Sequence, residues 1–457
     1  MKYKLLLLVF FTTVTWHAQT VSQKLDAAVH KLLSNSVAQS ASLSFYVADK
    51  NGKMIYEYQP NIGLSTASTQ KIFTAAAVLE ELGPEYRYFT TLSYSGNLSN
   101  EVLKGNLYLF STGDPTLGSW RYTGFKPEDF KKEIIASLKQ KNIKEITGDL
   151  IIDDSYFDFQ TVPGGWPWND IGNYYGAGVW GVNWRENQFD VQLTRGEIKS
   201  INIPLPGVQW VNDVEVSGNY DQSLIFTAPH SPVAHINGKL PAKSITVSGA
   251  TPNPPLSLGY ELKDWLQQAG ISFSGTIISA SEERSAGTSI PAGSKTEILK
   301  YYSPTLEKMV YWFMRKSINL YGETFVKTLA KEKKNEGSFS AGVDYLKRFW
   351  TNKGISSVML NFADGSGLSP QNYVSAKAEV QALQWSQKQS WYPIFLESLP
   401  VQGNGMKMKS GTMKNTKSFA GYHTSKSGEQ YTFAIIINNY QGSNSSDALY
   451  QILNNLK

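Results

Sequence analysis

Ser68 and Lys71 lie three residues apart at the start of an alanine-rich stretch, LSTASTQKIFTAAAVLEELGP. On a helix, residues i and i+3 share a face, so the lysine amine would lie beside the serine hydroxyl. Backbone N–H groups at a helix start can also stabilise a developing oxyanion. The pair is a candidate nucleophile and base if burial or nearby cations lower the lysine pKa. Taken alone, the pattern favours the alternative, a serine N-cap followed by a solvated lysine.

Two further motifs, far along the chain, support the catalytic interpretation. Ser317–Asn319 joins helices predicted at 304–316 and 320–332, which places a hydroxyl and an amide on a short connection that can face a cleft. Lys409–Thr412 continues a predicted strand, as the edge strand of a cleft would, whereas a second K-S-G at 426–428 is predicted to be a hairpin turn. Penicillin-recognising serine enzymes combine S-x-x-K, S-x-N and K-[TS]-G in this order.

The composition narrows the possible functions. The chain has 457 residues, of which 41% are hydrophobic and 18% charged. This length suits two or three domains of roughly 100–200 residues each. A formal net charge of +5 is too small to indicate nucleic acid or an anionic membrane surface as a partner. The absence of cysteine excludes disulfides and thiolate metal sites, and no H-E-x-x-H spacing suggests a zinc hydrolase. We expect no metal or organic cofactor.

The first twenty residues, MKYKLLLLVFFTTVTWHAQT, predict an export signal. Two lysines precede a short apolar run, which is typical of a secretory signal peptide. The run is too short to span a membrane, since a spanning helix needs about 20 apolar residues. An uncleaved anchor or a buried helix is the alternative. A cysteine-free exported chain of this size suits a bacterial envelope, so we expect a periplasmic location.

The elements that must position the motifs fall into two groups. Helix and strand patterns alternate at the two ends of the chain, with helices at 23–39 and 69–82 and again from 304 onward, and the C-terminal end gives strands at 406–411, 417–425 and 430–439. The middle is mainly β, with one helix at 127–140. We therefore predict an α+β domain made of residues 21–88 and 295–457, interrupted by a β-rich insertion at 89–294 that forms two nested subdomains.

The chain resembles the DacB-type D-alanyl-D-alanine carboxypeptidases and endopeptidases, which are class C low-molecular-mass penicillin-binding proteins. The similarity covers nearly the whole chain beyond the signal and includes GDPTL, GDLIIDDSYFD, GWPWND, SPTLEKMVYWFMRKSINLYGETFVK and ADGSGLS. Family members also carry a long insertion between their first two motifs. The resemblance implies a serine transpeptidase/β-lactamase-like fold, an antiparallel sheet flanked by helices.

The resemblance also implies the catalytic roles. Ser68 would attack the carbonyl between two D-alanines, with Lys71 as its base. Ser317 would pass a proton to the leaving amine. Lys409 would add positive potential, which lowers the pKa of Lys71 and attracts the substrate carboxylate. Backbone N–H groups of Ser68 and Thr412 would form the oxyanion hole.

Substrate-binding roles follow from the same resemblance. Asn319 would hold the peptide amide, and Ser410, next to Gly411, would hydrogen-bond the carboxylate. Asp170, with Tyr175 nearby, would receive the ammonium group of the stem-peptide side chain, or else Asp170 is a loop cap.

Two neighbouring positions are less directly tied to catalysis. Asp364 in ADGSGLS is interpreted as structural, holding a tight turn beside the site. Pro370 stands where the family often has arginine, which leaves the substrate preference open.

The predicted activity is hydrolysis of D-Ala-D-Ala peptides and cross-links of peptidoglycan, with β-lactams as acylating inhibitors. One alternative is a β-lactamase or esterase on the same scaffold, against which the long insertion and the lack of a deacylating glutamate motif argue. The other alternative is a catalytically silent envelope protein that only binds peptidoglycan. The intact set of three motifs argues against it. The oligomeric state and the third residue of the stem peptide stay open.

Overall fold

The computed structural model describes residues 19–457. The predicted signal peptide therefore lies, apart from its last two residues, outside the described residues. The first helix, α1 (Val21–Leu33), begins directly after Thr20, whose hydroxyl accepts the Gln23 N–H. Among residues 19–457, no helix combines the length and apolar character required to cross a membrane.

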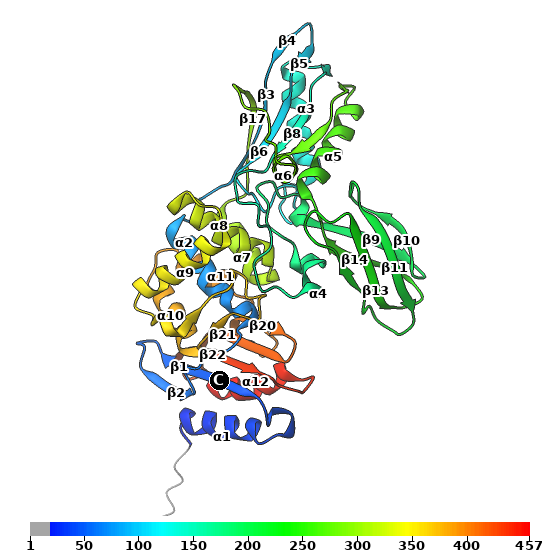
Figure 1. Ribbon diagram of the computed structural model, residues 1–457. Coiled ribbons are helices and arrows are strands. Elements are labelled where there is room, and N and C mark those ends of the chain that lie inside the picture. Colours follow the sequence, from blue (N-terminus) through cyan, green and yellow to red (C-terminus); the bar gives the residue numbers. More distant parts are fainter. Residues whose placement is uncertain (1–18) are drawn as a thin grey trace, which may run out of the picture.

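A five-stranded antiparallel sheet unites the two ends of the chain in the order β2-β1-β22-β21-β20 (Figure 1). Its strands are β1 (Ser42–Asp49), β2 (Met54–Tyr58), β20 (Lys407–Met413), β21 (Thr416–Thr424) and β22 (Gln430–Asn438). β20, which carries the K-S-G motif, lies at the sheet edge as the sequence predicts. The second K-S-G forms the turn between β21 and β22, also as predicted. The fold is α+β.

Helices cover both faces of this sheet. One face packs against α1 and α12 (Ser445–Leu453). The other carries the larger helical layer, which consists of α2 (Lys71–Glu81), α7 (Leu306–Lys316), α8 (Asn319–Lys334), α9 (Phe339–Asn352), α10 (Ala376–Ser386) and α11 (Tyr392–Ser398). A small ribbon of β18 (Leu360–Asn361) and β19 (Tyr373–Val374) lies beside it. Helix α11 was not predicted from the sequence.

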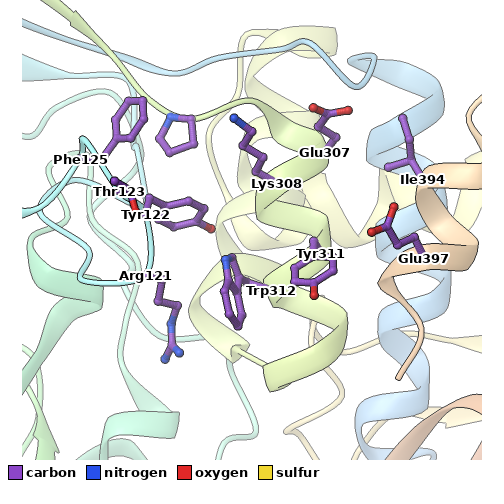
Figure 2. A pocket seen from close by; sticks show the side chains of 11 residues that line it. Arg121, Tyr122, Thr123, Phe125, Glu307, Lys308, Tyr311, Trp312, Ile394 and Glu397 are labelled. Carbon is purple, nitrogen blue, oxygen red and sulfur yellow. The ribbon is translucent and has the colours of Figure 1, made fainter. Parts of the chain in front are cut away.

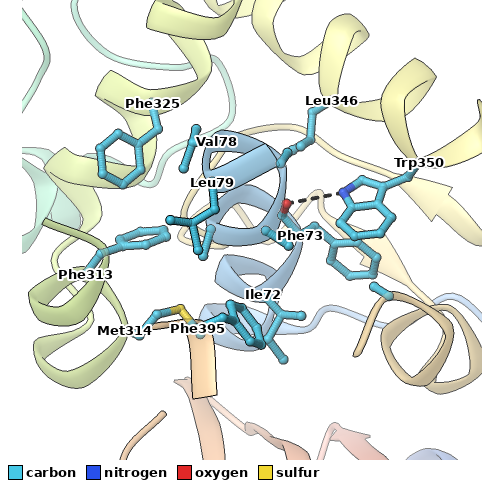
Figure 3. Packing of buried hydrophobic residues seen from close by; sticks show 14 of the residues in the cluster. Ile72, Phe73, Val78, Leu79, Phe313, Met314, Phe325, Leu346, Trp350 and Phe395 are labelled. Atoms are coloured by element: carbon cyan, nitrogen blue, oxygen red, sulfur yellow. Dashed lines mark hydrogen bonds between the residues drawn. The ribbon is translucent and has the colours of Figure 1, made fainter. Parts of the chain in front are cut away.

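Helix α2 is the centre of the helical layer (Figure 3). Every residue from Lys71 to Leu79 is buried. Large side chains from neighbouring helices surround it, namely Phe313, Met314, Phe325, Leu346, Trp350 and Phe395. The Trp350 indole also donates to the Phe73 carbonyl over 3.3 Å. The helix that follows the candidate nucleophile is therefore fixed on all sides.

The middle of the chain first builds a mixed sheet in the order β16-β8-β6-β3-β17. Its strands are β3 (Phe89–Tyr94), β6 (Leu107–Ser111), β8 (Leu150–Asp153), β16 (Ile277–Ser279) and β17 (Thr296–Tyr302), and a smaller sheet holds β4 (Asn97–Ser99), β5 (Val102–Lys104), β7 (Glu145–Ile146) and β15 (Ser272–Phe273). These sheets share one apolar core with α3 (Pro127–Gln140), whose bounds match the prediction, and with α5 (Pro254–Gln268). The short helix α6 (Ala280–Ser285) follows β16.

The prediction that the middle of the chain is mainly β with a single helix at 127–140 was wrong at NPPLSLG, because this segment begins the long helix α5. The Asn253 side chain caps the helix by accepting the Leu256 N–H, and two prolines fill its first turn, where no N–H is needed. Buried Leu258, Leu262 and Leu266 then recur at helical spacing. The prolines looked like loop signals, although they mark a helix start.

A second inserted unit has its own apolar core. It consists of two three-stranded sheets, β10-β9-β14 and β11-β13-β12. The strands are β9 (Gln188–Thr194), β10 (Glu197–Ile201), β11 (Gln209–Val216), β12 (Leu224–Phe226), β13 (Val233–Leu240) and β14 (Ser244–Ala250). In Figure 1 the short helix α4 (Trp168–Ile171) lies between this unit and the five-stranded antiparallel sheet. The chain around α4 therefore connects the insertion to the motifs.

Candidate active site

Ser68 lies in a tight 3₁₀ turn, Ala67–Gln70, that runs directly into α2. Ala67 adopts φ 48°, a left-handed conformation that is uncommon for a residue with a side chain. The alternative, in which Ser68 is the N-cap of this helix, does not hold, since Gln70 occupies that position and no side chain makes a cap hydrogen bond. The serine hydroxyl is thus free for chemistry rather than used in holding the helix.

Lys71 is fully buried, and its amine is held by three acceptors. Nζ donates to Ser68 Oγ over 3.0 Å, to Asn319 Oδ1 over 2.7 Å and to the Ser366 carbonyl over 2.7 Å. These three bonds use every donor of an ammonium group and fix its position. Loss of one proton would leave a lone pair within reach of the Ser68 hydroxyl, which is the geometry of a general base.

Burial lowers the pKa of Lys71 to about 7, although the carboxylates of Asp364 and Glu323 act in the opposite direction. The prediction that Lys409 lowers the pKa of Lys71 was wrong about the main cause, which is burial. Burial and the charge of Lys71 together lower the pKa of Lys409 well below its ordinary value. The charge of the nearby Lys417 amine acts on Lys409 in the same direction.

Ser317 ends helix α7 in the left-handed conformation, with φ 57° and ψ 39°. A serine rarely adopts this conformation, and such strain persists where surrounding contacts hold it. Lys409 Nζ donates to Ser317 Oγ over 3.1 Å, so one contact joins the second motif to the third. The left-handed turn directs the hydroxyl into the cleft instead of continuing α7.

Asn319 begins α8 and bridges two parts of the chain. Its Oδ1 accepts from Lys71, and its Nδ2 donates to the Tyr175 carbonyl of the insertion over 2.8 Å. Both ends of the side-chain amide are therefore in use without substrate. Substrate would have to share these bonds or take the place of the Tyr175 carbonyl.

Gly411 allows strand β20 to approach the Ser68 turn closely. A Cβ at this position would overlap the Thr66 carbonyl oxygen and lie 2.9 Å from the Ser68 backbone nitrogen. The neighbouring strand supports the contact, because Ser418 Oγ donates to the same carbonyl and accepts from Thr69. The glycine of the K-S-G motif is thus required by a backbone approach rather than by a turn.

A cleft of about 560 Å³ opens over these groups. Six predicted site residues line it, namely Ser68, Ser317, Asn319, Thr412, Asp170 and Tyr175. Pro370, which stands where the family often has arginine, lines it as well. Tyr175 donates its hydroxyl to Asp170 Oδ1 over 3.3 Å. Lys71 and Lys409 are buried beneath the cleft. Ser410, predicted to bind the carboxylate, is not among the lining residues.

Sequence reasoning missed Glu323, which is fully buried below Lys71. Its two carboxylate oxygens accept the backbone N–H groups of Gly365 and Ser366, over 3.0 and 2.9 Å, and thereby position the Ser366 carbonyl that holds Lys71. Burial and the charge of Asp364 raise the pKa of Glu323 to about 8. Its spacing of four residues from Asn319 on one helix face was an available signal.

Asp364 itself holds a tight turn, as predicted. Its carboxylate accepts the backbone N–H groups of Gly367 and Ser369 over 2.7 and 2.6 Å. Trp166 of the insertion donates to the same carboxylate over 2.9 Å. This turn therefore fixes the cleft wall and connects it to the inserted region.

The profile of the D-Ala-D-Ala carboxypeptidase 3 (S13) family matches residues 25–456. The chain belongs to this family. Among its relatives, the D-alanyl-D-alanine carboxypeptidase DacB of Haemophilus influenzae is 26% identical over 89% of this chain and 88% of its own length. The D-alanyl-D-alanine carboxypeptidase of an Actinomadura species is 24% identical over 91% of this chain and 81% of its own.

Solved structures give the same relationship. The crystal structure of penicillin binding protein 4 (dacB) from H. influenzae has a TM-score of 0.79 at 25% identity and covers 94% of this chain and 98% of that one. A second structure of that protein, complexed with a β-lactam, has a TM-score of 0.73 at 23% identity over 95% of this chain and 98% of that one. The resemblance inferred from the motifs is confirmed at the level of family and fold.

Proposed function

We propose that this protein is a periplasmic serine hydrolase that removes the terminal D-alanine from peptidoglycan stem peptides and cuts the corresponding cross-links. One observation carries the proposal: the Lys71 amine lies 3.0 Å from Ser68 Oγ, is fully buried and has a pKa lowered to about 7. A hydroxyl paired with an amine of this kind is an activated nucleophile. The substrate class, peptides that end in D-Ala-D-Ala, follows from membership of the D-Ala-D-Ala carboxypeptidase 3 (S13) family and from the activity of the named relatives.

The reaction proceeds in two stages. Neutral Lys71 takes the Ser68 proton as Oγ attacks the carbonyl, and the Ser68 and Thr412 N–H groups stabilise the resulting oxyanion. Ser317, held by Lys409, relays the proton from Lys71 to the leaving D-alanine nitrogen, which leaves Lys71 neutral and Ser317 protonated. Water then hydrolyses the acyl-enzyme, with Lys71 again accepting a proton.

Substrate binding in this proposal uses both walls of the cleft. Asp170 and Tyr175 receive the ammonium group of the peptide side chain, and Asn319 holds a backbone amide. Burial raises the pKa of Asp170, and an ammonium ligand would lower it again by favouring the ionised form. Lys409 attracts the terminal carboxylate.

The proposed domain division follows the predicted boundaries. Residues 21–88 and 295–457 carry the nucleophile and the three motifs. Residues 89–294 contribute the wall that includes Asp170. Residues 1–20 direct export.

A fluorescent penicillin tests the nucleophile. Wild-type protein should form a covalent adduct, and Ser68→Ala should form none. An adduct that survives Ser68→Ala would refute the assignment of Ser68. Release of D-alanine from a pentapeptide, measured in parallel, separates the proposal from its alternatives. Rapid turnover of the adduct without D-alanine release would indicate a β-lactamase, and neither activity would indicate a binding protein.

A further inference from the structure

A second cavity, of about 450 Å³, lies outside the catalytic cleft. It opens between α7, α11 and the loop at residues 121–125 of the insertion (Figure 2). No residue lining it also lines the cleft. Its volume is in the range of sites that hold small molecules. The cavity shares one element with the active site, because α7 ends at Ser317.

Aromatic rings and charged groups line the cavity together. Figure 2 shows Tyr122 of the loop beside Trp312 of α7, and Tyr311 between Trp312 and Glu397 of α11. Trp312 and Tyr311 are only partly buried, so their rings are accessible. Such rings offer flat apolar surface with a polar edge. A ligand that fits must combine an apolar face with hydrogen-bonding groups.

The charged side chains are available to a ligand. Within residues 19–457, Glu307, Lys308 and Glu397 take part in no ion pair. Arg121 also lines the cavity, but its charge is already paired with Glu186, so the unpaired groups are two carboxylates and one ammonium. This lining disfavours an anion, because the two carboxylates would repel a phosphate, whereas a neutral ligand can hydrogen-bond to all three groups.

Buried Glu186 holds Arg121 directly and Tyr122 through Tyr321. Arg121 Nε donates to both oxygens of this carboxylate, over 2.9 and 3.0 Å, and its outer nitrogens have no acceptor in the described part of the chain. The Tyr122 hydroxyl donates to the Tyr321 hydroxyl over 3.1 Å, and the Tyr321 hydroxyl donates to Glu186 over 2.8 Å. The guanidinium lies 6.0 Å from the Trp312 ring. One wall of the cavity is therefore held in place before any ligand binds.

The backbone around Glu186 is strained. Arg185, Glu186 and Asn187 have φ values of 52°, 53° and 52°, three consecutive left-handed residues with side chains. Backbone strain of this kind is found where a site must be held in one arrangement. The strain therefore supports a binding role for the wall that Glu186 fixes.

We propose that this cavity binds the glycan part of peptidoglycan, an N-acetylated amino-sugar segment. A pyranose ring has an apolar C–H face that stacks on Trp312 or Tyr311, and its hydroxyl and acetamide groups can bond to carboxylates, ammonium and guanidinium. The inference rests on the proposed function, since a stem peptide reaches the cleft attached to such a glycan. The cavity would hold the polymer while the cleft holds the peptide.

The probe is a peptide-free N-acetylglucosamine oligomer, and binding is measured by calorimetry with the full chain before and after acylation by penicillin. We expect binding in both states, because acylation blocks only the cleft. Trp312→Ala and the milder Glu397→Gln should each weaken binding by about tenfold or more. Tyr220→Ala, an exposed aromatic residue of the second inserted unit, is the matched control and should bind as wild type.

Thermal unfolding verifies that each variant is folded. The proposal is overturned if wild type binds no oligomer, if acylation abolishes binding, or if both cavity variants bind as tightly as wild type. The two proposals can fail separately. Absence of a Ser68 adduct with intact oligomer binding would refute the catalytic proposal, and a normal adduct without oligomer binding would refute the glycan site.

Discussion

Raising the pH through neutrality should switch on acylation of Ser68, because only neutral Lys71 can accept the serine proton. Burial lowers the pKa of Lys71 from 10.5 to about 7. At pH 7 about half of the molecules then carry the neutral amine, against roughly one in 3000 for a lysine in water. Below this pKa the rate should fall about tenfold for each pH unit, and above it the rate should level off.

The assay is stopped-flow acylation by a β-lactam whose carboxylate stays ionised throughout the pH range. The second-order rate constant reports on the free enzyme, so its midpoint gives the pKa of the unliganded base. A rate that is independent of pH, or a midpoint close to the ordinary lysine value, would refute the assignment of Lys71 as the base.

Asn319→Asp tests the same electrostatics with almost no change in shape. It places a carboxylate where Asn319 Oδ1 now lies, 2.7 Å from the Lys71 amine. An opposite charge at this distance should raise the pKa of Lys71 and move the midpoint upward by about one to three pH units. Asn169→Asp, which adds the same charge to the cleft lining without a hydrogen bond to Lys71, is the control and should move it little. Equal shifts in both variants would mean that the midpoint reflects the overall charge of the cleft.

Three other substitutions have expected outcomes. Gly411→Ala places a methyl group 2.9 Å from the Ser68 backbone nitrogen. It should slow acylation by about 10²–10³-fold, as loss of an oxyanion-hole donor does. An unchanged rate would contradict the role of the Ser68 N–H in the oxyanion hole. Glu186→Gln removes the charged partner of a guanidinium that keeps 20% exposure, and should lower the free energy of unfolding by about 2–3 kcal/mol in urea titrations. Pro370→Arg adds a cation to the cleft wall and should lower KM for peptides with a free terminal carboxylate by about tenfold, leaving amidated peptides unaffected.

The sequence predicted which motif residues come together where spacing sets geometry. Ser68 and Lys71 share a helical turn, and a connection between two helices can place Ser317 and Asn319 in a cleft. Local patterns also identified β20 as the strand of the K-S-G motif. These predictions succeeded because each depends on a few adjacent residues and on the order of the motifs.

Other features depend on packing, which spacing does not encode. The pKa of Lys71 follows from its complete burial, and no local pattern distinguished a buried lysine from a solvated one. The turn of Ser68 differs from a simple helix start because Ala67 is left-handed. Helix α5 was misjudged because its prolines resemble loop signals.

The alanine-rich helix α2 explains why the lysine at its start can act as a base. Ala75, Ala76 and Ala77 are all fully buried, and every residue of α2 from Lys71 to Leu79 is buried with them. Close packing of the helix that carries Lys71 excludes water from the amine. Exclusion of water is what makes the charged form of Lys71 unfavourable and lowers its pKa. The apolar composition of α2 therefore serves the chemistry as well as the core, and the three acceptors of the amine keep it from leaving the site when it is protonated.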